Sequence, residues 1–168
     1  KTMKKLLFLA LAAITIEGAI AQERKRASPR ETTSGNDQVS VSYGRPYKKG
    51  RVVFGQLEKF GSVWRIGADE ATEITFKKDG TFAGKPVKAG TYTMFALINQ
   101  DEWEIILNSE LKQWGAYGYE KIKDKNVLNS KVPTQKTSGV VEQLTIVTEA
   151  DGLTISWDDT MVKVPYKF

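Results

Sequence analysis

Cysteine and histidine are both absent from this chain of 168 residues. Without cysteine the protein forms no disulfide, so its stability must come from its hydrophobic core. The two absences together exclude Ser-His-Asp and Cys-His catalysis, and they exclude zinc sites built from His or Cys ligands. Any catalysis would have to use carboxylates, Lys, Tyr or Ser, and any bound metal would be a hard cation held by oxygen. We therefore expect no metal site and no cofactor.

No apolar stretch is long enough for a transmembrane helix. The longest, Leu6 to Ile16, covers 11 residues, whereas a helix needs about 20 to cross a bilayer. It follows a basic start and precedes Ala19-Ile20-Ala21, which is the order of a secretory signal peptide and its cleavage site. We predict that residues 1–21 are a signal peptide cleaved after Ala21. No transmembrane segment is then expected after cleavage, and the protein is predicted to be periplasmic or secreted.

The positive charge of the chain is small and spread out. The formal net charge is +5, and it falls to +3 without the three lysines and one glutamate of residues 1–21. Basic residues are mixed with acidic ones, and the one dense group, Glu23–Arg26, is typical of a solvated tail. A nucleic-acid surface needs a clustered stripe of Lys and Arg. We therefore expect no nucleic-acid partner.

From residue 38 onward, apolar and polar residues alternate as in half-buried strands. Val39, Val41 and Tyr43 begin the pattern, whereas residues 22–37 show no apolar periodicity and are expected to form an extended lead-in. Turn residues such as Asp151-Gly152 separate the runs. The other predicted strands are Glu73–Phe76, Thr91–Asn99, Trp103–Asn108, Val127–Val132, Val141–Thr148, Leu153–Trp157 and Val162–Phe168.

Short strands at this spacing predict an all-β fold. We expect residues 38–168 to form a single domain, an antiparallel β-sandwich or partly open barrel with one or two short helical turns. The candidate turns are Ser109–Gln113 and Tyr119–Lys123. The alternating end, Val162–Phe168, is also typical of outer-membrane barrels. The sandwich is favoured because most runs are shorter than the ~10 residues of a membrane strand and because Pro165 interrupts the last run.

Several motifs resemble those of a known family. The most specific is the string from Trp64 to Thr72, and the others are Ser42–Pro46, Lys49–Gly55, Ala89–Tyr92, Trp103–Asn108 and Gln113–Tyr117. They are similar to the domain of unknown function 2911 family, which is found mainly in exported proteins of Bacteroidetes-type bacteria. The resemblance covers about residues 27–168. It implies a β-rich periplasmic fold and no established activity.

Two positions depart from the family's pattern. Arg30 stands where the family commonly has His, and Asp69 stands where it usually has Asn. If that His were a metal ligand or a catalytic base in the family, this protein would have lost the function. If its role is only packing or hydrogen bonding, Arg30 could replace it. The absence of His here argues against a family-wide mechanism that depends on one.

Three arginines, Arg45, Arg51 and Arg65, lie beside Pro, Gly or Trp residues in segments that are predicted to be partly buried. A guanidinium can bind a carboxylate or phosphate through two parallel hydrogen bonds, and Glu70 is a natural partner for one of them. These residues could form a pocket for an anion or a sugar, or an internal Arg–Glu network that fixes a loop. The network is favoured, because buried charges are usually paired for structural reasons. In the pocket interpretation the apolar walls are Trp64, Trp114 and Tyr117.

The other tryptophans have different sequence contexts. Trp103 opens an alternating strand and Trp157 closes one, which favours core positions for both. Trp114 follows Gln113 in a loop, where a large aromatic residue needs another reason to be present. Aromatic faces bind sugar rings, so Trp114 is the best single site candidate. Gln113 and Asn108 are the neighbouring amides that could contact the same ligand.

The sequence favours a non-catalytic, exported binding or interaction module, with a small anionic or sugar ligand or an envelope protein as partner. Two alternatives stay open. One is a carboxylate-dependent periplasmic hydrolase acting on glycan or peptide, in which Glu70 with a raised pKa is the general acid or base. The other is a structural subunit of an outer-membrane assembly, which would expose a contiguous apolar patch. The predicted ligand-binding residues are Arg45, Arg51, Trp64, Arg65, Glu70, Asn108, Gln113, Trp114 and Tyr117.

Overall fold

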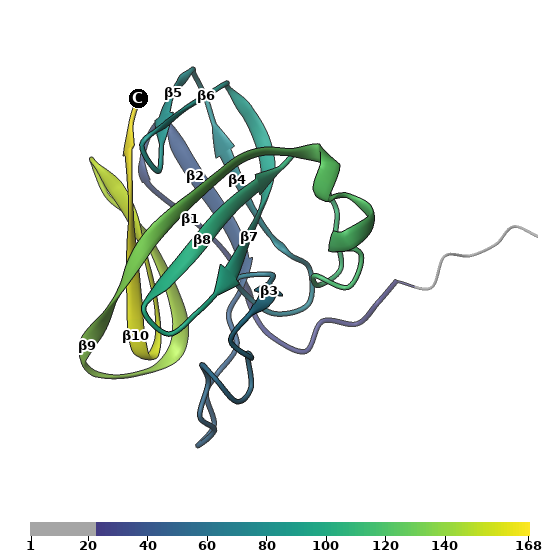
Figure 1. The fold of residues 1–168 in the computed structure, drawn as a ribbon, viewed down its shortest axis with the longest axis vertical. Helices are drawn as coiled ribbons and strands as arrows, with labels where there is room; N and C mark the ends of the chain where they lie inside the picture. Colours follow the sequence, from purple (N-terminus) through teal and green to yellow (C-terminus); the bar gives the residue numbers. More distant parts are fainter. Residues whose placement is uncertain (1–22) are drawn as a thin grey trace, which may run out of the picture.

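A computed structural model describes residues 23–168, and the predicted signal peptide, residues 1–21, lies outside this part. Strands dominate the described residues, whose helical elements are two 3-10 turns (Figure 1). The all-β prediction is therefore confirmed. The elements are β1 (Arg30–Asn36), β2 (Val39–Gly44), β3 (Ser62–Trp64), β4 (Thr72–Phe76), β5 (Gly80–Phe82), β6 (Lys85–Val87), β7 (Gly90–Ile98), β8 (Glu102–Asn108), η1 (Tyr119–Lys121), η2 (Lys123–Lys125), β9 (Asn126–Thr148) and β10 (Gly152–Lys167).

The strands form one antiparallel sheet in the order β1-β2-β4-β7-β8-β9-β10-β5-β6. β3 pairs with β7 beyond the end of β4, so β3 and β4 follow one another along the same edge of β7. The sheet curls around the core (Figure 1). Across the core, the hydroxyl of Tyr43 in β2 accepts a hydrogen bond from the backbone N–H of Ile146 in β9 at 2.9 Å. The sheet does not close, because β1 and β6 remain at its two ends. Of the two predicted arrangements, a β-sandwich or a partly open barrel, it matches the second.

β9 and β10 form a long, bent hairpin. The sequence predicts four separate strands here, whereas the structure has two, joined at the predicted Asp151-Gly152 turn. The pairing register shifts on either side of Asp158, whose φ is 54°. Bulges of this kind bend a strand without ending it. Polar residues at the bend therefore interrupt the apolar pattern but not the backbone pairing.

The core is built around a cluster of aromatic rings. The ring centroid of Trp64 lies 5.6 Å from that of Trp103 and 6.0 Å from that of Trp157. Phe54 packs against all three rings. The three tryptophans are almost fully buried, as the strand positions of Trp103 and Trp157 predict. Because each ring removes a large apolar area from water, this cluster is a main source of stability in a protein without disulfides.

The outer face of β7 and β8 is covered by η1. Tyr119 of η1 packs on Phe95 with ring centroids 5.3 Å apart, which buries a second, smaller apolar cluster. The helical turn predicted here is confirmed. The turn predicted at Ser109–Gln113 is wrong, because the side-chain oxygen of Asn108 accepts the backbone N–H two residues on at 2.8 Å and Lys112 has φ of 58°. The backbone of this segment is therefore an irregular loop.

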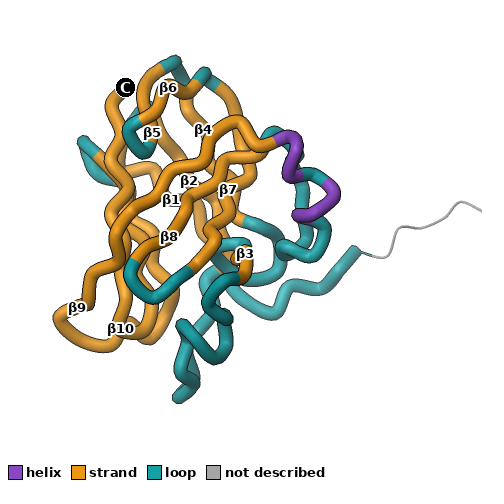
Figure 2. The backbone as a smooth tube through the Cα atoms, viewed as in Figure 1, coloured by secondary structure: helices purple, strands orange, loops and turns teal. Residues whose placement is uncertain are grey.

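Part of the predicted lead-in, residues 22–37, is a strand. β1 pairs with β2 from Arg30 to Asn36, although its sequence lacks alternating apolar residues. An edge strand pairs with a neighbour along only one of its two edges, and such strands commonly carry polar or charged side chains. The preceding residues 23–29, here named the N-terminal arm, run beside the loops 45–61 and 109–118, on the side of the sheet where β3 lies (Figure 2). Together with residues 63–70, which comprise part of β3 and the loop after it, these three segments form the candidate site.

Candidate functional site

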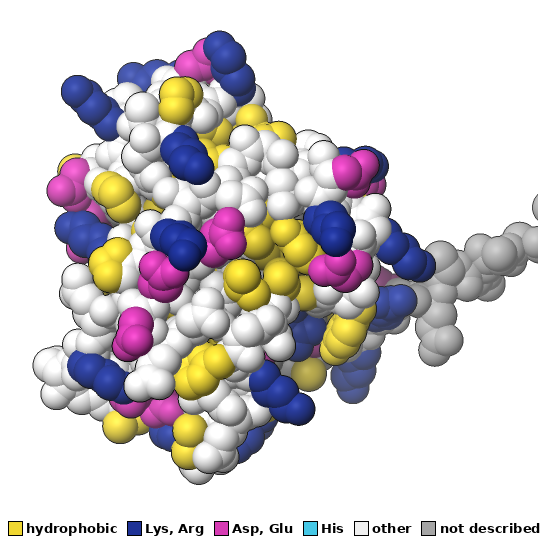
Figure 3. Space-filling view, viewed as in Figure 1, with side chains coloured by type: hydrophobic (Ala, Val, Ile, Leu, Met, Phe, Trp, Pro, Cys, Tyr) yellow, Lys and Arg dark blue, Asp and Glu magenta, His cyan; other side chains and the backbone are white. Residues whose placement is uncertain are grey.

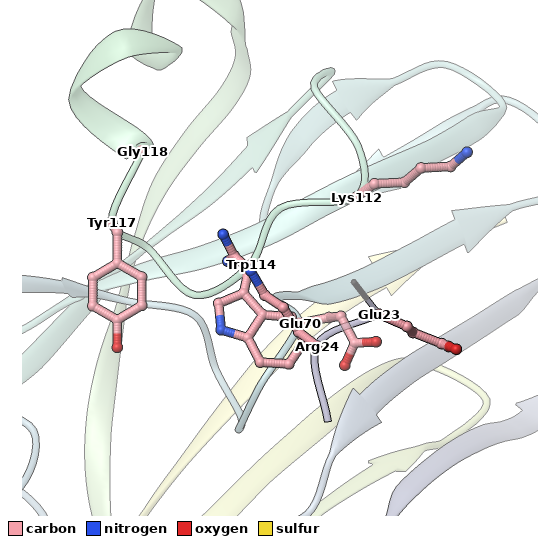
Figure 4. A pocket seen from close by; sticks show the side chains of 7 residues that line it. All are labelled: Glu23, Arg24, Glu70, Lys112, Trp114, Tyr117 and Gly118. Carbon is pink, nitrogen blue, oxygen red and sulfur yellow. The ribbon is translucent and has the colours of Figure 1, made fainter. Parts of the chain in front are cut away.

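Three adjoining cavities lie where the N-terminal arm meets the loops 45–61 and 109–118. The first, here named the Trp114 pocket, has a volume of about 630 Å³ and opens to solvent. Figure 4 shows Trp114 and Tyr117 projecting from the loop toward the same side, with Glu70 next to Trp114. The pocket is lined by Glu23, Arg24, Glu70, Lys112, Trp114, Tyr117 and Gly118.

Short backbone contacts fix the loop that carries Trp114. Trp114 forms an isolated antiparallel bridge with Glu70. The next residue, Gly115, has φ of 68°. A Cβ at Gly115 would lie 2.6 Å from the Tyr117 ring and 3.0 Å from the Arg65 guanidinium. Glycine is therefore required at this position, and it allows Tyr117 and Arg65 to approach the same point of the loop.

The N-terminal arm lies across the Trp114 pocket. The guanidinium carbon of Arg24 is 5.4 Å from the centroid of the Trp114 ring, which is a cation–π contact. Further along the arm, the carboxylate of Asp69 accepts the backbone N–H groups of Ala27 and Ser28 at 2.9 and 3.0 Å. Asp69 is buried, so these two hydrogen bonds anchor the arm to the domain. The arm is thus part of the pocket wall.

Glu70 is held in an ion pair. Its carboxylate accepts hydrogen bonds from Nε of Arg26 at 2.7 and 3.0 Å, and the Arg30 guanidinium lies 3.8 Å away. The hydrogen bond from Arg26 lowers the pKa of Glu70 below its ordinary value, and the charge of Arg30 adds to the effect. The hydrolase alternative needs a raised pKa instead, so the structure gives no support to Glu70 as a general acid near neutral pH.

The second cavity, here named the Glu58 hollow, has a volume of about 200 Å³ and shares Tyr117 with the Trp114 pocket. Trp64 is only 2% exposed. Its indole N–H makes no hydrogen bond of good geometry among residues 23–168, but it interacts with the Glu58 carboxyl and lowers the pKa of that group. Nε of Arg65 donates to the carbonyl of Gly67 at 3.1 Å, which leaves the two terminal nitrogens of this guanidinium for another acceptor. The hollow is lined by Glu58, Val63, Trp64, Arg65, Ala116 and Tyr117.

Glu58 is a site residue that the sequence does not indicate. It stands next to Lys59 in a loop, where nothing in the pattern suggests burial. Burial raises the pKa of Glu58 from its ordinary value to about 7, although the positive charges of Arg65 and Arg51 act in the opposite direction. This carboxyl therefore changes charge near neutral pH. A perturbed carboxyl inside a cavity is a candidate functional group.

The third cavity, here named the Arg51 cleft, has a volume of about 500 Å³ and adjoins the hollow, because Glu58 and Arg65 line both. Arg51 lines the cleft and is exposed. Its Nε and one terminal nitrogen donate to the carbonyl oxygens of Lys48 and Tyr47 at 2.8 and 2.7 Å. Arg51 is therefore fixed by its own loop, with one terminal nitrogen left for a ligand.

Three of the predicted site residues lie away from these cavities. Arg45 donates to a backbone carbonyl of β9 at 3.0 Å and is paired with Glu31. The predicted pairing of Glu70 with Arg45, Arg51 or Arg65 is wrong, because Arg26 and Arg30 of the N-terminal segment reach Glu70 instead. Asn108 is fully buried, and its side-chain nitrogen donates to a backbone carbonyl at 2.7 Å. Gln113 donates to a carbonyl of its own loop at 3.2 Å. The predicted residues that do line the cavities are Arg51, Trp64, Arg65, Glu70, Trp114 and Tyr117.

The described part of the chain offers few features for other functions. Within residues 23–168, no three His, Cys, Asp or Glu side chains come together to hold a metal ion. The same residues contain no helix with the length and apolar character needed to cross a membrane. On the face shown in Figure 3, apolar side chains gather near the centre and are bordered by charged ones.

Comparison with known proteins gives a single family. The family described as a protein of unknown function (DUF2911) matches residues 26–166. The chain matches no curated protein and no solved structure. The matched range contains β1 to β9 and nearly all of β10. It also contains every residue that lines the Glu58 hollow and the Arg51 cleft, and all of the Trp114 pocket except Glu23 and Arg24.

Proposed function

We propose that this chain, which belongs to the DUF2911 family of proteins of unknown function, is an exported, non-catalytic module that binds a sugar in the Trp114 pocket. The observation that carries the proposal is the pair of aromatic side chains, Trp114 and Tyr117, that line one open cavity (Figure 4). Tyr117 is 83% exposed. An aromatic ring this exposed contributes little to the core, so it is available to a ligand.

The polar groups around the two rings suit the chemistry of a sugar. A sugar ring has apolar C–H faces and a rim of hydroxyls, so it binds where aromatic faces lie beside hydrogen-bonding groups. Glu70 and Lys112 line the same pocket. A carboxylate accepts hydrogen bonds and an ammonium donates them, so hydroxyl groups find partners of both kinds at the edge of the pocket.

The N-terminal arm shares the pocket with the proposed ligand. The guanidinium of Arg24 lies over the Trp114 ring, where a sugar ring would stack. A cation–π contact at an exposed site contributes only about 0.5–1 kcal/mol. A sugar can therefore displace Arg24 at low cost, while Asp69 keeps the rest of the arm in place.

Export is supported by the basic start, the apolar stretch and the small-residue cleavage site within residues 1–21. The lack of cysteine fits passage into an oxidising compartment, where no wrong disulfide can form. Mass spectrometry of the protein from a cell-envelope or culture fraction should give an N-terminus at Gln22. An intact N-terminus on protein that stays in the cytoplasm would contradict the proposed export.

The binding proposal is tested by titrating the exported protein with glucose and short neutral glucans, followed by the indole NMR resonance of Trp114. We expect this resonance to shift on binding, and the Trp114→Ala variant to lose binding with little change in stability. The matched control is Tyr47→Ala, which removes an exposed ring from the Arg51 cleft instead. Sugar binding that survives Trp114→Ala, or no sugar binding by the unaltered protein, would refute the proposal.

A further inference from the structure

The Glu58 hollow contains hydrogen-bond donors that face a carboxyl whose charge changes near neutral pH. The buried indole N–H of Trp64 makes no hydrogen bond of good geometry among residues 23–168, but its interaction with the Glu58 carboxyl lowers the pKa of that group. The terminal nitrogens of Arg65 have no hydrogen-bond acceptor among the same residues. A buried donor without an acceptor is unfavourable. Trp64 and Arg65 therefore face the Glu58 carboxylate when it is charged, and they can take another acceptor in the hollow when it is protonated.

The size and chemistry of the hollow fit a carboxylate. Its volume of about 200 Å³ is several times the ~30 Å³ that one water molecule occupies in the liquid. The planar guanidinium of Arg65 can donate two parallel hydrogen bonds to a carboxylate. The indole N–H of Trp64 supplies a third donor. An anion with two oxygens on one carbon therefore matches the donors that are present.

The hollow and the Trp114 pocket are joined through Tyr117, which lines both. The position of a Cβ on Gly115 lies 2.6 Å from the Tyr117 ring and 3.0 Å from the Arg65 guanidinium, so the ring and the guanidinium are close neighbours. A ligand with its carboxylate on Arg65 would therefore place the adjoining atoms against Tyr117. A sugar acid has this form, with a carboxylate attached directly to the ring.

The protonation state of Glu58 decides whether the hollow can bind an anion. When Glu58 is charged, its carboxylate competes for the same donors and repels an anion. When it is protonated, its negative charge no longer offsets the positive charge of the basic residues around it, and its O–H becomes another hydrogen-bond donor. The other charged or titratable groups near Glu58 are Arg65 and Arg51, which act on it directly, Tyr117 in the hollow, and Tyr47, Lys49 and Asp69 in the adjoining cleft.

We propose that the Glu58 hollow is an acidic subsite of the sugar site, in which Trp64 and Arg65 bind the carboxylate of a uronic acid whose ring lies against Tyr117. This inference rests on the sugar-binding function proposed above and adds the class of sugar. Affinity for a uronic acid is then greatest when Glu58 is protonated, and it falls as the pH rises through the pKa of Glu58.

The experiment compares glucuronate with glucose, titrated into the exported protein at about pH 5.5 and about pH 8.5, on either side of the Glu58 transition. At the lower pH glucuronate should bind roughly tenfold more tightly than glucose, because charge-assisted hydrogen bonds are among the stronger ones. At the higher pH this preference should shrink. The indole N–H resonance of Trp64 should shift strongly with glucuronate and little with glucose.

Three variants separate the roles of the charged groups. Arg65→Gln should remove the preference for glucuronate. Glu58→Gln cannot ionise, so its preference should be the same at both pH values. Lys121→Gln is the control for the loss of one positive charge, because Lys121 is exposed and lines none of the three cavities.

The outcomes distinguish the subsite from the sugar site itself. If glucose binds but glucuronate binds no more tightly at the lower pH, the subsite is refuted while the proposed function stands. The same holds if the preference persists in Arg65→Gln or if the Trp64 resonance does not respond to glucuronate. If neither sugar binds, the proposed function fails and the subsite fails with it.

Discussion

The four tryptophans of this chain lie in two different regions. Trp64, Trp103 and Trp157 meet in the interior, where their rings pack against one another. Trp114 lies in a loop, and its ring contacts the guanidinium of Arg24. Strand pairing fixes the first group, so those rings stabilise the fold, whereas the loop leaves the fourth ring for a ligand. Trp64 has both roles, because its ring is in the core and it also lines the Glu58 hollow.

The two regions should differ most in how much their tryptophans contribute to the free energy of unfolding. Trp103→Ala removes a fully buried ring and should lower the free energy of unfolding by about 3–5 kcal/mol, because it leaves a cavity in the core. Trp114→Ala should lower it by less than about 1 kcal/mol. Urea unfolding of both variants measures these values. Similar losses in the two variants would mean that Trp114 also belongs to the core.

A smaller effect concerns the hollow beside Trp64. The pKa of Glu58 is raised from 4.5 to about 7 in the folded protein, so the folded state binds a proton more tightly than the unfolded state. The stabilisation from this proton is complete below the unfolded pKa and is lost as the pH rises through 7. The loss should reach up to about 3 kcal/mol.

Glu58→Gln should remove this part of the pH dependence. The free energy of unfolding, measured for both proteins between about pH 5 and pH 8, should fall more steeply for the unaltered protein. The difference between the two curves isolates Glu58, because all other titrating groups are shared. Parallel curves would show that Glu58 has an ordinary pKa in the folded protein.

Loss of the hydrogen bonds that attach the N-terminal arm should lower the free energy of unfolding by about 1–2 kcal/mol. Asp69→Ala removes the acceptor of two backbone N–H groups and places Ala at a φ of 63°, which L-residues other than Asn and Asp rarely adopt. Hydrogen exchange at Ala27 and Ser28 should become much faster. Asp69→Asn is the control, since an amide oxygen still accepts and Asn tolerates this φ. Unchanged protection in Asp69→Ala would mean that the arm is held elsewhere.

The smallest effect is expected from Arg24→Ala. Removing the guanidinium from the Trp114 ring frees the face on which a sugar would stack. A cation–π contact of about 0.5–1 kcal/mol corresponds to a two- to fivefold gain in sugar affinity, with stability nearly unchanged. Lys25→Ala serves as the control for the loss of one positive charge. A lower affinity in Arg24→Ala would show that Arg24 binds the ligand and does not compete with it.

The fold was predictable from the sequence wherever side chains alternate. Val39, Val41 and Tyr43 in β2 follow the pattern, and all three are buried. β1 escapes this rule because its polar residues are held at the edge by backbone hydrogen bonds with β2. The bend at Asp158 departs from the rule in the opposite way. The sequence there predicts a break between two strands, but the backbone pairing of β9 and β10 continues through a bulge.

The candidate site was less predictable, because it depends on which loops meet. Trp114 could be identified from its loop context, and Arg65 from its neighbours in the sequence. Glu58 could not be identified, since its own loop shows no pattern of burial and the hollow that it lines with Trp64 and Arg65 forms only in the folded protein. Arg45 has the same sequence features as Arg65, but it meets Glu31 and β9 instead of a cavity. Residue type alone does not separate these two arginines.

The open sheet also bears on whether copies of this protein associate with one another. Its two end strands, β1 and β6, each present an edge to which another chain could add a strand. β6 has only three residues, and Pro86 at its centre offers no N–H to a neighbour. β1 changes register before its end, and the backbone N–H of Gly35 is already bonded to Thr148 of β9. Both edges are therefore poor templates for strand addition, which would keep newly made copies from aggregating as they fold without disulfides.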